Sequence, residues 1–178
     1  MSKRNFRLVR DIAIAVAIIV IFLQLIGPSI VIEHSMENTL HSHDYVFFAK
    51  QAYTFGDAHF GDIIVFRTAL DDKHEGKKTL IKRIIGIPGD TVEIKSNAVY
   101  RNGVPLNEPY TKDGYTSGEM TKMIIPEGYY FVMGDNRAVS KDSRDPDVGL
   151  VSESNIRGKV IFRLFPLSDI GPIQKIQD

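Results

Sequence analysis

The segment "TLIKRIIGIPGD", residues 79–90, alternates aliphatic side chains around two adjacent basic residues and ends at a Pro-Gly turn signal. Strand periodicity places Lys82 on one face and Arg83 on the other, each between large aliphatics. A buried charge is costly unless it is paired or neutralised. Arg83 must therefore reach water or a carboxylate, whereas desolvation can lower the pKa of Lys82. The segment is either an edge strand with both side chains at the surface or a strand that holds Lys82 as a general base.

The chain after residue 32 continues this β pattern. Short apolar or alternating runs recur between turn signals, which is typical of a mostly β domain. The runs that we expect to form strands are 45–50, 62–68, 79–87, 91–95, 98–103, 129–135 and 159–166. We expect a polar loop over 69–78 and a loop extension over 107–122. No run of ten or more of these residues has clean helical periodicity, so residues 33–178 are predicted to form one mostly β domain.

The run from residue 12 to residue 32 contains no charged side chain. Its 21 residues would span about 31 Å as a helix, close to a hydrocarbon core of ~30 Å. Gly27 and Pro28 are expected to end or kink this helix. The alternative is a cleaved signal peptide, but no clear Ala-x-Ala cleavage site follows the run. We therefore predict a transmembrane anchor over 12–32.

The N-terminal tail, residues 1–11, carries four basic residues and one acidic residue, a net charge of +3. Such a cluster before an apolar run favours a cytoplasmic N-terminus. The expected protein is single-pass in the cell membrane, with residues 33–178 outside the cytoplasm. The whole chain of 178 residues has a net charge of zero, so nothing suggests a nucleic-acid partner. It contains no cysteine, which excludes disulfides, thiol catalysis and cysteine-bound metals.

The segment "VIEHSMENTL", residues 31–40, places a serine just beyond the apolar run. His34 adjoins Ser35, but neighbouring side chains of an extended chain point to opposite faces, so His34 is not a convincing base. The five histidines of the chain lie in this segment or in polar turns and loops, and no pair has metal-site spacing. We expect surface histidines and no metal, and Lys82 becomes the candidate base for Ser35.

A dense polar loop, "VMGDNRAVSKDSRDPDVGLV", occupies residues 132–151. As an ordinary loop it would be solvated and rich in Asx and Ser turns. Acidic and basic residues around small hydroxyl residues also suit a rigid shell that orients a catalytic amine.

Together these segments resemble the bacterial type I signal peptidases, which are membrane-bound serine proteases with a Ser/Lys dyad. The resemblance covers nearly the whole chain in order, and its motifs are "SMENTL", "KRIIGIPGD", "GDNRAVSKDSR" and "GKVIFRLFP". One anchor and no large insertion resemble the short Gram-positive form. The implied fold is a mostly antiparallel β structure with barrel-like sheets, shared with LexA-type self-cleaving repressors.

The resemblance also implies residue roles. Ser35, followed by Met36, matches the nucleophile, Lys82 matches the general base, and Ser140 matches the hydroxyl that orients the lysine. Two further pairs match structural ion pairs beside the site: Arg83 with Asp135, and Asp142 with Arg144. The implied reaction is acyl transfer from a signal peptide to Ser35, with the Ser35 N–H in the oxyanion hole. No metal or cofactor is implied, and the partners are signal peptides of exported preproteins, the bilayer and the secretion translocase nearby.

Two positions depart from the family pattern. Asn38 stands where the family usually has proline, which loosens one backbone torsion without removing a reacting group. Glu33 stands where the family usually has glycine or serine, two residues before the nucleophile. In an extended chain Glu33 shares a face with Ser35, where its carboxylate would oppose an oxyanion and raise the pKa of a nearby lysine.

Two other functions compete with an active signal peptidase. Glu33 motivates a catalytically weak or silent relative that assists surface-protein or pilus assembly. Against this alternative, the candidate residues Ser35, Lys82 and Ser140 are all present. A LexA-like autoproteolytic regulator would need a DNA-binding unit where this chain has an apolar anchor. The sequence leaves open the preferred substrates, the pKa of Lys82 and the oligomeric state.

Overall fold

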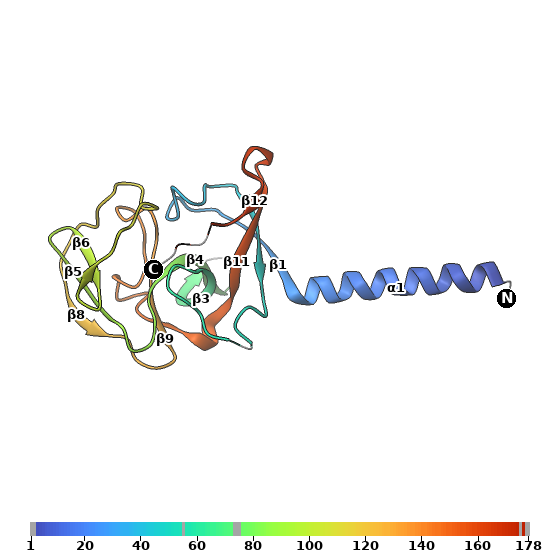
Figure 1. Ribbon diagram of the computed structural model, residues 1–178, viewed down its shortest axis with the longest axis horizontal. Helices are drawn as coiled ribbons and strands as arrows, with labels where there is room; N and C mark the ends of the chain where they lie inside the picture. The colour runs from blue at the N-terminus through green and yellow to red at the C-terminus, as the bar shows by residue number, and fades with distance from the viewer. Residues whose placement is uncertain (1–2, 55, 73–75, 175, 177–178) are drawn as a thin grey trace.

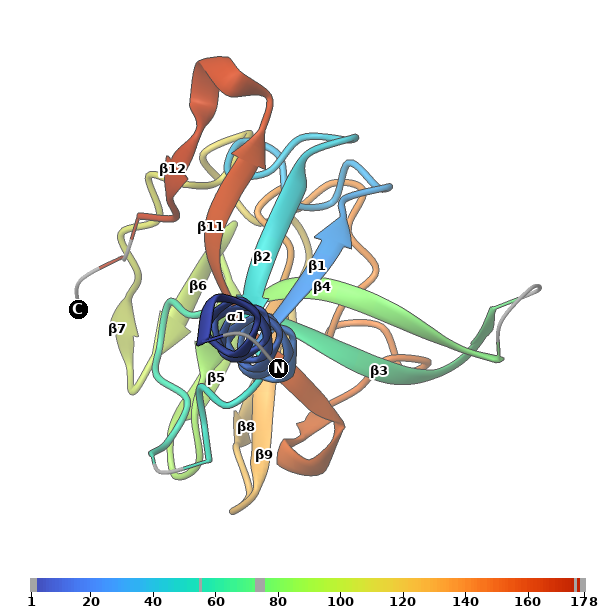
Figure 2. The same ribbon diagram turned by 90° about the vertical axis from the view of Figure 1, so that its right-hand side faces the viewer.

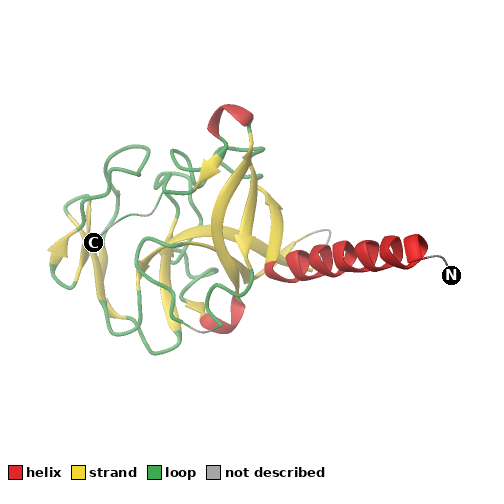
Figure 3. Ribbon diagram, turned by 45° about the vertical axis from the view of Figure 1, so that its right-hand side comes forward, coloured by secondary structure: helices red, strands yellow, loops and turns green. Residues whose placement is uncertain are grey.

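The structure is a computed structural model in which residues 3–54, 56–72, 76–174 and 176 are described (Figure 1). Helix α1 spans Lys3–Leu25 and stands away from the rest of the molecule as a free rod (Figures 1 and 3). The stretch Arg7–Leu25 is long and apolar enough to cross a membrane, and none of it is buried. The domain meets the helix at its C-terminal end, where the Phe22 ring contacts Phe47 and Lys50 donates to the Leu23 carbonyl. The exposed apolar surface of the rest is what a membrane-spanning helix requires.

The helix ends just before Gly27 and Pro28, the residues that were expected to end or kink it, and it begins earlier than the apolar run. The helix begins at Lys3 rather than residue 12 and ends at Leu25, and the following residues form strand β1, Ile26–Ile30. Pro28 has no N–H to donate and cannot continue a helix. At Gly27 an added Cβ would lie 2.3 Å from the Phe48 ring, so only glycine lets β1 approach its neighbour this closely. The end of the apolar run therefore belongs to the β domain.

The β domain contains two antiparallel sheets, which confirms the predicted mostly antiparallel β fold behind an apolar N-terminal helix. The larger sheet has the order β1-β2-β11-β3-β4-β9-β10, with β12 paired to β11. Its other strands are β2 (Tyr45–Ala49), β3 (Ile63–Asp72), β4 (Gly76–Gly86), β9 (Tyr129–Met133), β10 (Val151–Ser152), β11 (Ile156–Phe165) and β12 (Gly171–Pro172). The smaller sheet, ordered β7-β6-β5-β8, comprises β5 (Thr91–Lys95), β6 (Ala98–Arg101), β7 (Val104–Pro105) and β8 (Met120–Ile124). Two single 3-10 turns, η1 (Glu153–Asn155) and η2 (Leu167–Asp169), flank β11.

Most predicted strands are confirmed, but the loop expected over 69–78 is largely strand. β3 and β4 form a long hairpin, in which β3 ends at Asp72 and β4 begins at Gly76. Residues 73–75, which belong to the expected loop, lie outside the described residues. Figure 2 shows this hairpin extending sideways from the domain, as seen along α1. The extension of 107–122 is mostly loop, as expected, and β8 begins at Met120.

Strands β3 and β4 lie at the centre of the core. Ile63 and Val65 of β3 contact one apolar cluster, while Ile64 and Phe66 contact a second cluster on the other face. A strand buried on both faces reads as a continuous apolar run, which is the pattern of residues 63–66. β4 pairs with β3 in register, with Lys82 opposite Ile64. The two basic residues of β4 are therefore carried into the interior of the domain.

Candidate active site

Ser35 lies in a series of turns between β1 and β2, not in extended chain. The N–H of Glu37 donates to the carbonyl of His34 at 3.3 Å, and the N–H groups of Thr39 and Leu40 both donate to the carbonyl of Met36 at 2.8 Å. Met36 and Leu40 are buried in the core and fix the turns to the domain. The assumption of an extended chain around Ser35 was therefore wrong.

His34 points away from the serine, although the reason differs from the predicted one. Its imidazole is exposed and lies 2.6 Å from a carboxylate oxygen of Glu37. Lys112 donates to the other oxygen of Glu37 at 2.7 Å. The hydrogen bonds from Lys112 and His34 lower the pKa of Glu37 to about 2. This surface cluster leaves Ser35 without a histidine partner among the described residues.

The β4 strand brings Lys82 to Ser35 across 47 positions of sequence. Lys82 Nζ lies 2.7 Å from Ser35 Oγ and also donates to the carbonyl of Ile81 at 3.1 Å. Both side chains are buried. Burial lowers the pKa of Lys82 from 10.5 to about 8, although the carboxylates of Glu33 and Asp142 act in the opposite direction. An amine with this pKa is about half neutral near pH 8, and a neutral amine in this position can accept the serine proton.

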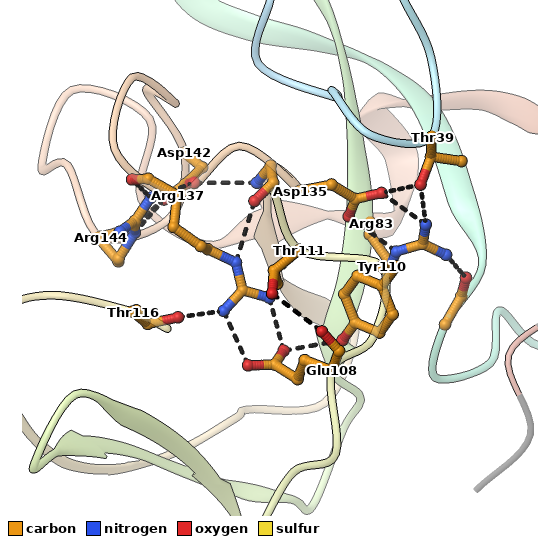
Figure 4. Close-up of polar contacts among 12 residues, drawn as sticks. Thr39, Arg83, Glu108, Tyr110, Thr111, Thr116, Asp135, Arg137, Asp142 and Arg144 are labelled. Carbon is orange, nitrogen blue, oxygen red and sulfur yellow. Dashed lines mark hydrogen bonds and ion pairs between the residues drawn. The ribbon is translucent and has the colours of Figure 1, made fainter. Parts of the chain in front are cut away.

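Arg83 is the neighbour of Lys82 on β4, so strand alternation places its side chain on the opposite face. Figure 4 shows the Arg83 side chain together with Asp135 and Thr39. Its guanidinium donates to both carboxylate oxygens of Asp135, at 2.8 and 2.6 Å, and both side chains are essentially inaccessible. The remaining donors reach the Gly61 carbonyl at 2.9 Å and Thr39 Oγ1 at 3.0 Å. The guanidinium also lies 4.3 Å from the centre of the Tyr110 ring. Through Thr39, this fully bonded pair connects β4 to residues 34–40, the turns around the candidate nucleophile Ser35, which we call the nucleophile turn.

The second expected pair is also formed. Arg144 donates to both carboxylate oxygens of Asp142 at 2.8 Å (Figure 4). The N–H of Gly134 donates to Asp142 at 3.0 Å. Burial alone would raise the pKa of Asp142, but the hydrogen bonds and charge of Arg144 hold it below its usual value. The pair fixes the polar loop to the end of β9, next to Gly134.

Ser140 lies beside the site but does not make the expected bond. Within the described part of the chain Ser140 Oγ is buried and makes no hydrogen bond to Lys82, while its hydroxyl is among the groups that lower the pKa of Asp142. A Cβ added at Gly134 would lie 2.3 Å from Ser140 Oγ and 2.4 Å from the Ser35 carbonyl oxygen. Gly134 therefore allows the loop and the nucleophile turn to meet, and Ser140 reaches the site by packing rather than by bonding the lysine.

Two contributors were not predicted from sequence. Asn136 holds the nucleophile turn, because its backbone N–H donates to the Ser35 carbonyl at 3.0 Å and its side chain donates to the His34 carbonyl at 3.1 Å. Arg137 forms a third ion pair in this region, with Glu108, at 2.9 and 2.5 Å (Figure 4). The dense polar loop was the available signal for Asn136 and Arg137, but nothing local pointed to Glu108, which lies 29 residues away.

An open groove of about 700 Å³ leads to the serine and lysine. It is lined by residues 29–33, 35–36, 67, 78–82 and 157. A larger cavity of about 1130 Å³ lies behind the nucleophile turn, against Thr39, Arg83 and Arg163, and contains neither Ser35 nor Lys82. Among the described residues no group of three or more histidine, aspartate or glutamate side chains could hold a metal ion.

A β domain that holds a buried lysine against a serine hydroxyl at an open groove has the arrangement of a serine hydrolase. The sequence profile of the family described as signal peptidase, peptidase S26, matches residues 5–165. A signal peptidase I from Bacillus licheniformis is 35% identical over 95% of this chain and 94% of its own length. A signal peptidase IB from Staphylococcus aureus is 36% identical over 89% of each chain.

A crystal structure of a signal peptidase I from Enterococcus faecalis matches with a TM-score of 0.48 and 32% identity, over 58% of this chain and 96% of that chain. The family profile and the two curated relatives cover most of the sequence. The chain therefore belongs to the signal peptidase family, peptidase S26, and is a serine peptidase of that family. The family relationship inferred from the motifs is confirmed.

Proposed function

We propose that this chain is a membrane-anchored endopeptidase that removes N-terminal signal peptides from exported preproteins, with Ser35 as nucleophile and Lys82 as general base. The observation that carries the proposal is the 2.7 Å contact between Lys82 Nζ and Ser35 Oγ inside the domain. Burial lowers the pKa of Lys82 to about 8, which makes the neutral amine accessible near physiological pH. The printed names of the relatives supply the substrate class.

The first step is proton transfer from Ser35 Oγ to neutral Lys82, while Oγ attacks the scissile carbonyl. The negative charge then develops on the former carbonyl oxygen. Within the described residues the backbone N–H of Ser35 has no hydrogen-bond partner, so it is available as an oxyanion donor. Asn136 supports this role, since its bond to the His34 carbonyl fixes the peptide plane that carries the Ser35 N–H.

Collapse of the intermediate breaks the peptide C–N bond, and protonated Lys82 gives its proton to the leaving amine. The signal peptide remains as an acyl ester on Ser35. Lys82, neutral again, takes a proton from water, and the resulting attack releases the carboxylate product and restores the serine hydroxyl. Arg83–Asp135 and Asp142–Arg144 act as structural pairs that hold β4 and the polar loop in place. Ser140 is assigned a packing role at Gly134 in support of the lysine.

The substrate is proposed to bind as an added strand along β4. β9 pairs with β4 only from Arg83 onward, so among the described strands residues 78–82 have no partner on that edge. An extended peptide could use these backbone groups while its carbonyl reaches Ser35. The groove beside this edge is apolar near Leu80 and Ile81, which suits the small residues of a signal-peptide cleavage site.

Helix α1 is proposed to cross the membrane with the basic tail, residues 1–11, in the cytoplasm. The stretch Arg7–Leu25 supports a single span, and the β domain, residues 33–178 together with β1, would lie outside. Only nine residues separate Leu25 from Ser35, so the nucleophile stays close to the bilayer that holds the substrate's apolar segment. Enzyme and substrate would be anchored in the same bilayer, near the translocase. This shared anchoring raises the effective concentration of the substrate at Ser35.

The test is cleavage of a preprotein with an Ala-x-Ala site by detergent-solubilised full-length protein between about pH 6 and pH 10. We expect cleavage by the unchanged protein, none by Ser35→Ala or Lys82→Met, and unchanged cleavage by Lys122→Met, which alters an exposed lysine of β8. A serine-directed acylating probe should label Ser35 in the unchanged protein. Absence of both cleavage and labelling would overturn the proposal and return the chain to the silent, assembly-assisting alternative.

A further inference from the structure

Glu33 and Lys78 lie on opposite walls of the groove that leads to Ser35. Glu33 belongs to the segment that precedes the nucleophile, and Lys78 belongs to β4, four residues before Lys82. Lys78 Nζ donates to a carboxylate oxygen of Glu33, so an ion pair joins the two walls. The contact between Ser35 and Lys82 joins the same walls farther along. A peptide lying along β4 toward Ser35 must therefore pass the Glu33–Lys78 pair.

The pair is displaceable. The Glu33 side chain is 45% exposed and that of Lys78 is 39% exposed. Ion pairs with this much solvent access contribute little net free energy, because water competes for both partners. A substrate group that offers Lys78 an equivalent partner can replace Glu33, whose carboxylate can then be hydrated.

The charge of the groove decides which substrate group fits. Besides Lys78, the lining includes Arg67 of β3 and Arg157 of β11, both exposed. No ion pair is found for either arginine within the described part of the chain. Glu33 is the single acidic residue among the described lining residues. An incoming carboxylate therefore enters a groove whose lining carries Lys78, Arg67 and Arg157, whereas an incoming amine meets one carboxylate that is already paired.

We propose that Glu33 and Lys78 form a cross-groove ion pair that makes this enzyme select preproteins carrying an acidic side chain near the cleaved bond, where the substrate carboxylate displaces Glu33 and binds Lys78. The inference rests on the proposed signal-peptide cleavage at Ser35. Lys78 lies four strand positions from Lys82, about 13 Å along β4. A substrate strand of the same pitch would present its selected residue about four positions from the scissile bond.

The experiment uses the full-length protein in detergent and peptides with an Ala-x-Ala site. Asp, Asn or Lys is placed singly at each of the five positions on either side of the cleaved bond. The unchanged protein should cleave the Asp peptide about threefold to tenfold better than the Lys peptide, by kcat/KM, at one position about four residues from the bond. The Asn peptide should fall between them, and the difference should lie mainly in KM, because the contact is made on binding.

The charge-reversed variant Glu33→Lys/Lys78→Glu keeps a cross-groove pair with opposite polarity. It should lower or reverse the preference at that position, while Lys122→Glu on β8 should retain the original ratio. The Asp/Lys ratio of kcat/KM compares two peptides on the same protein sample, so a loss of folded protein lowers both values equally and leaves the ratio unchanged. An Asp/Lys ratio that is equal in the unchanged and charge-reversed proteins at every position would overturn the inference while leaving the cleavage function intact. No cleavage of any peptide by the unchanged protein would instead overturn the proposed function, and the inference with it.

Discussion

Lys82 and Arg83 are neighbours on β4 and both are buried, but the protein accommodates their charges in different ways. Arg83 stays charged and receives Asp135, the Gly61 carbonyl and Thr39 as partners. Lys82 receives a serine hydroxyl and one carbonyl, and its pKa falls to about 8. A fall from 10.5 to about 8 corresponds to roughly 3 kcal/mol of disfavoured charge at this site. The alternation of a strand is what allows one segment to supply both a permanent cation and a neutral base.

The pH dependence of cleavage should follow the protonation of Lys82. In the proposed mechanism the neutral amine of Lys82 is the active form, so kcat/KM should rise with pH and level off above about 8. The Glu33 carboxylate raises the pKa of Lys82 and the Lys78 cation lowers it, while Asp142 and Asp135 also raise it. Glu33→Gln should therefore shift the profile to lower pH and Lys78→Met to higher pH, each by roughly 0.3 to 1 pH unit.

Rates measured from about pH 6 to pH 10 would check this prediction. Glu127→Gln, which removes an exposed carboxylate outside the groove, is the matched control and should leave the profile in place. Shifts of the same sign for Glu33→Gln and Lys78→Met would contradict the electrostatic explanation.

At the level of elements, the site is the meeting point of β4, the nucleophile turn and the polar loop after β9. Each buried ion pair fixes a different junction. Arg83–Asp135 with Thr39 joins β4, the loop and the turn, and Asp142–Arg144 closes the loop on itself at Gly134. Fully bonded buried pairs of this kind give little net stability but penalise any arrangement that breaks them. The buried ion pairs therefore determine the position of the polar loop more than they add to the free energy of unfolding.

Gly134 is the point at which the polar loop touches the nucleophile turn. Its substitution by alanine would place Cβ 2.3 Å from Ser140 Oγ and 2.4 Å from the Ser35 carbonyl oxygen. One of these groups must move, and the Ser35 carbonyl is backbone held by Asn136. We expect Gly134→Ala to lower kcat by about 100-fold or more, because small displacements of a nucleophile are costly.

Gly56→Ala is the control for this substitution, since nothing lies within 4 Å of an added Cβ there. It should leave kcat and the unfolding midpoint unchanged. Equal activity of the Gly134→Ala and unchanged proteins, both folded by circular dichroism, would show that the turn tolerates displacement.

At the scale of the whole molecule, the boundary between helix and domain lies at Leu25. β1 pairs with β2 along its full length, from Ile26 opposite Ala49 to Ile30 opposite Tyr45. Val31, which follows β1, is 4% exposed in the apolar cluster that also contains Met36. The segment after α1 thus forms the edge of the sheet and then leads to Ser35, so we expect a cut at residue 32 to destabilise the domain.

Two truncated proteins test this boundary. A protein beginning at Ile26 lacks α1, retains β1, and should unfold at a denaturant concentration similar to that of the full chain. A protein beginning at Glu33 lacks β1 and Val31 and should lose about 2–4 kcal/mol of stability. Urea unfolding in the same detergent compares them directly. Equal stability of the two truncated proteins would show that β1 does not belong to the folded domain.

The residues of the site could be named from sequence, but their contacts could not. The resemblance of "SMENTL", "KRIIGIPGD" and "GDNRAVSKDSR" to signal-peptidase motifs implied Ser35, Lys82 and the partners of both expected ion pairs. The assumption of an extended chain failed at Ser35, because the bonds to the Met36 carbonyl form turns that periodicity does not reveal. The pair of Glu108 with Arg137 was missed for a related reason, since its partners are brought together only by the path of the long loop.

The sequence by itself determined the apolar run of the N-terminal helix and the alternation that makes β3 and β4 strands, and the resemblance of its motifs to signal peptidases pointed to the candidate site residues. The helix and the strands depend on local periodicity and on residue type, which are properties of neighbouring positions. The tertiary structure alone decided that Lys82 touches Ser35, that Ser140 packs against Gly134 without bonding the lysine, and that Glu33 crosses the groove to Lys78. These contacts depend on distances between segments far apart in the chain, which only the packing of the sheets and loops can set.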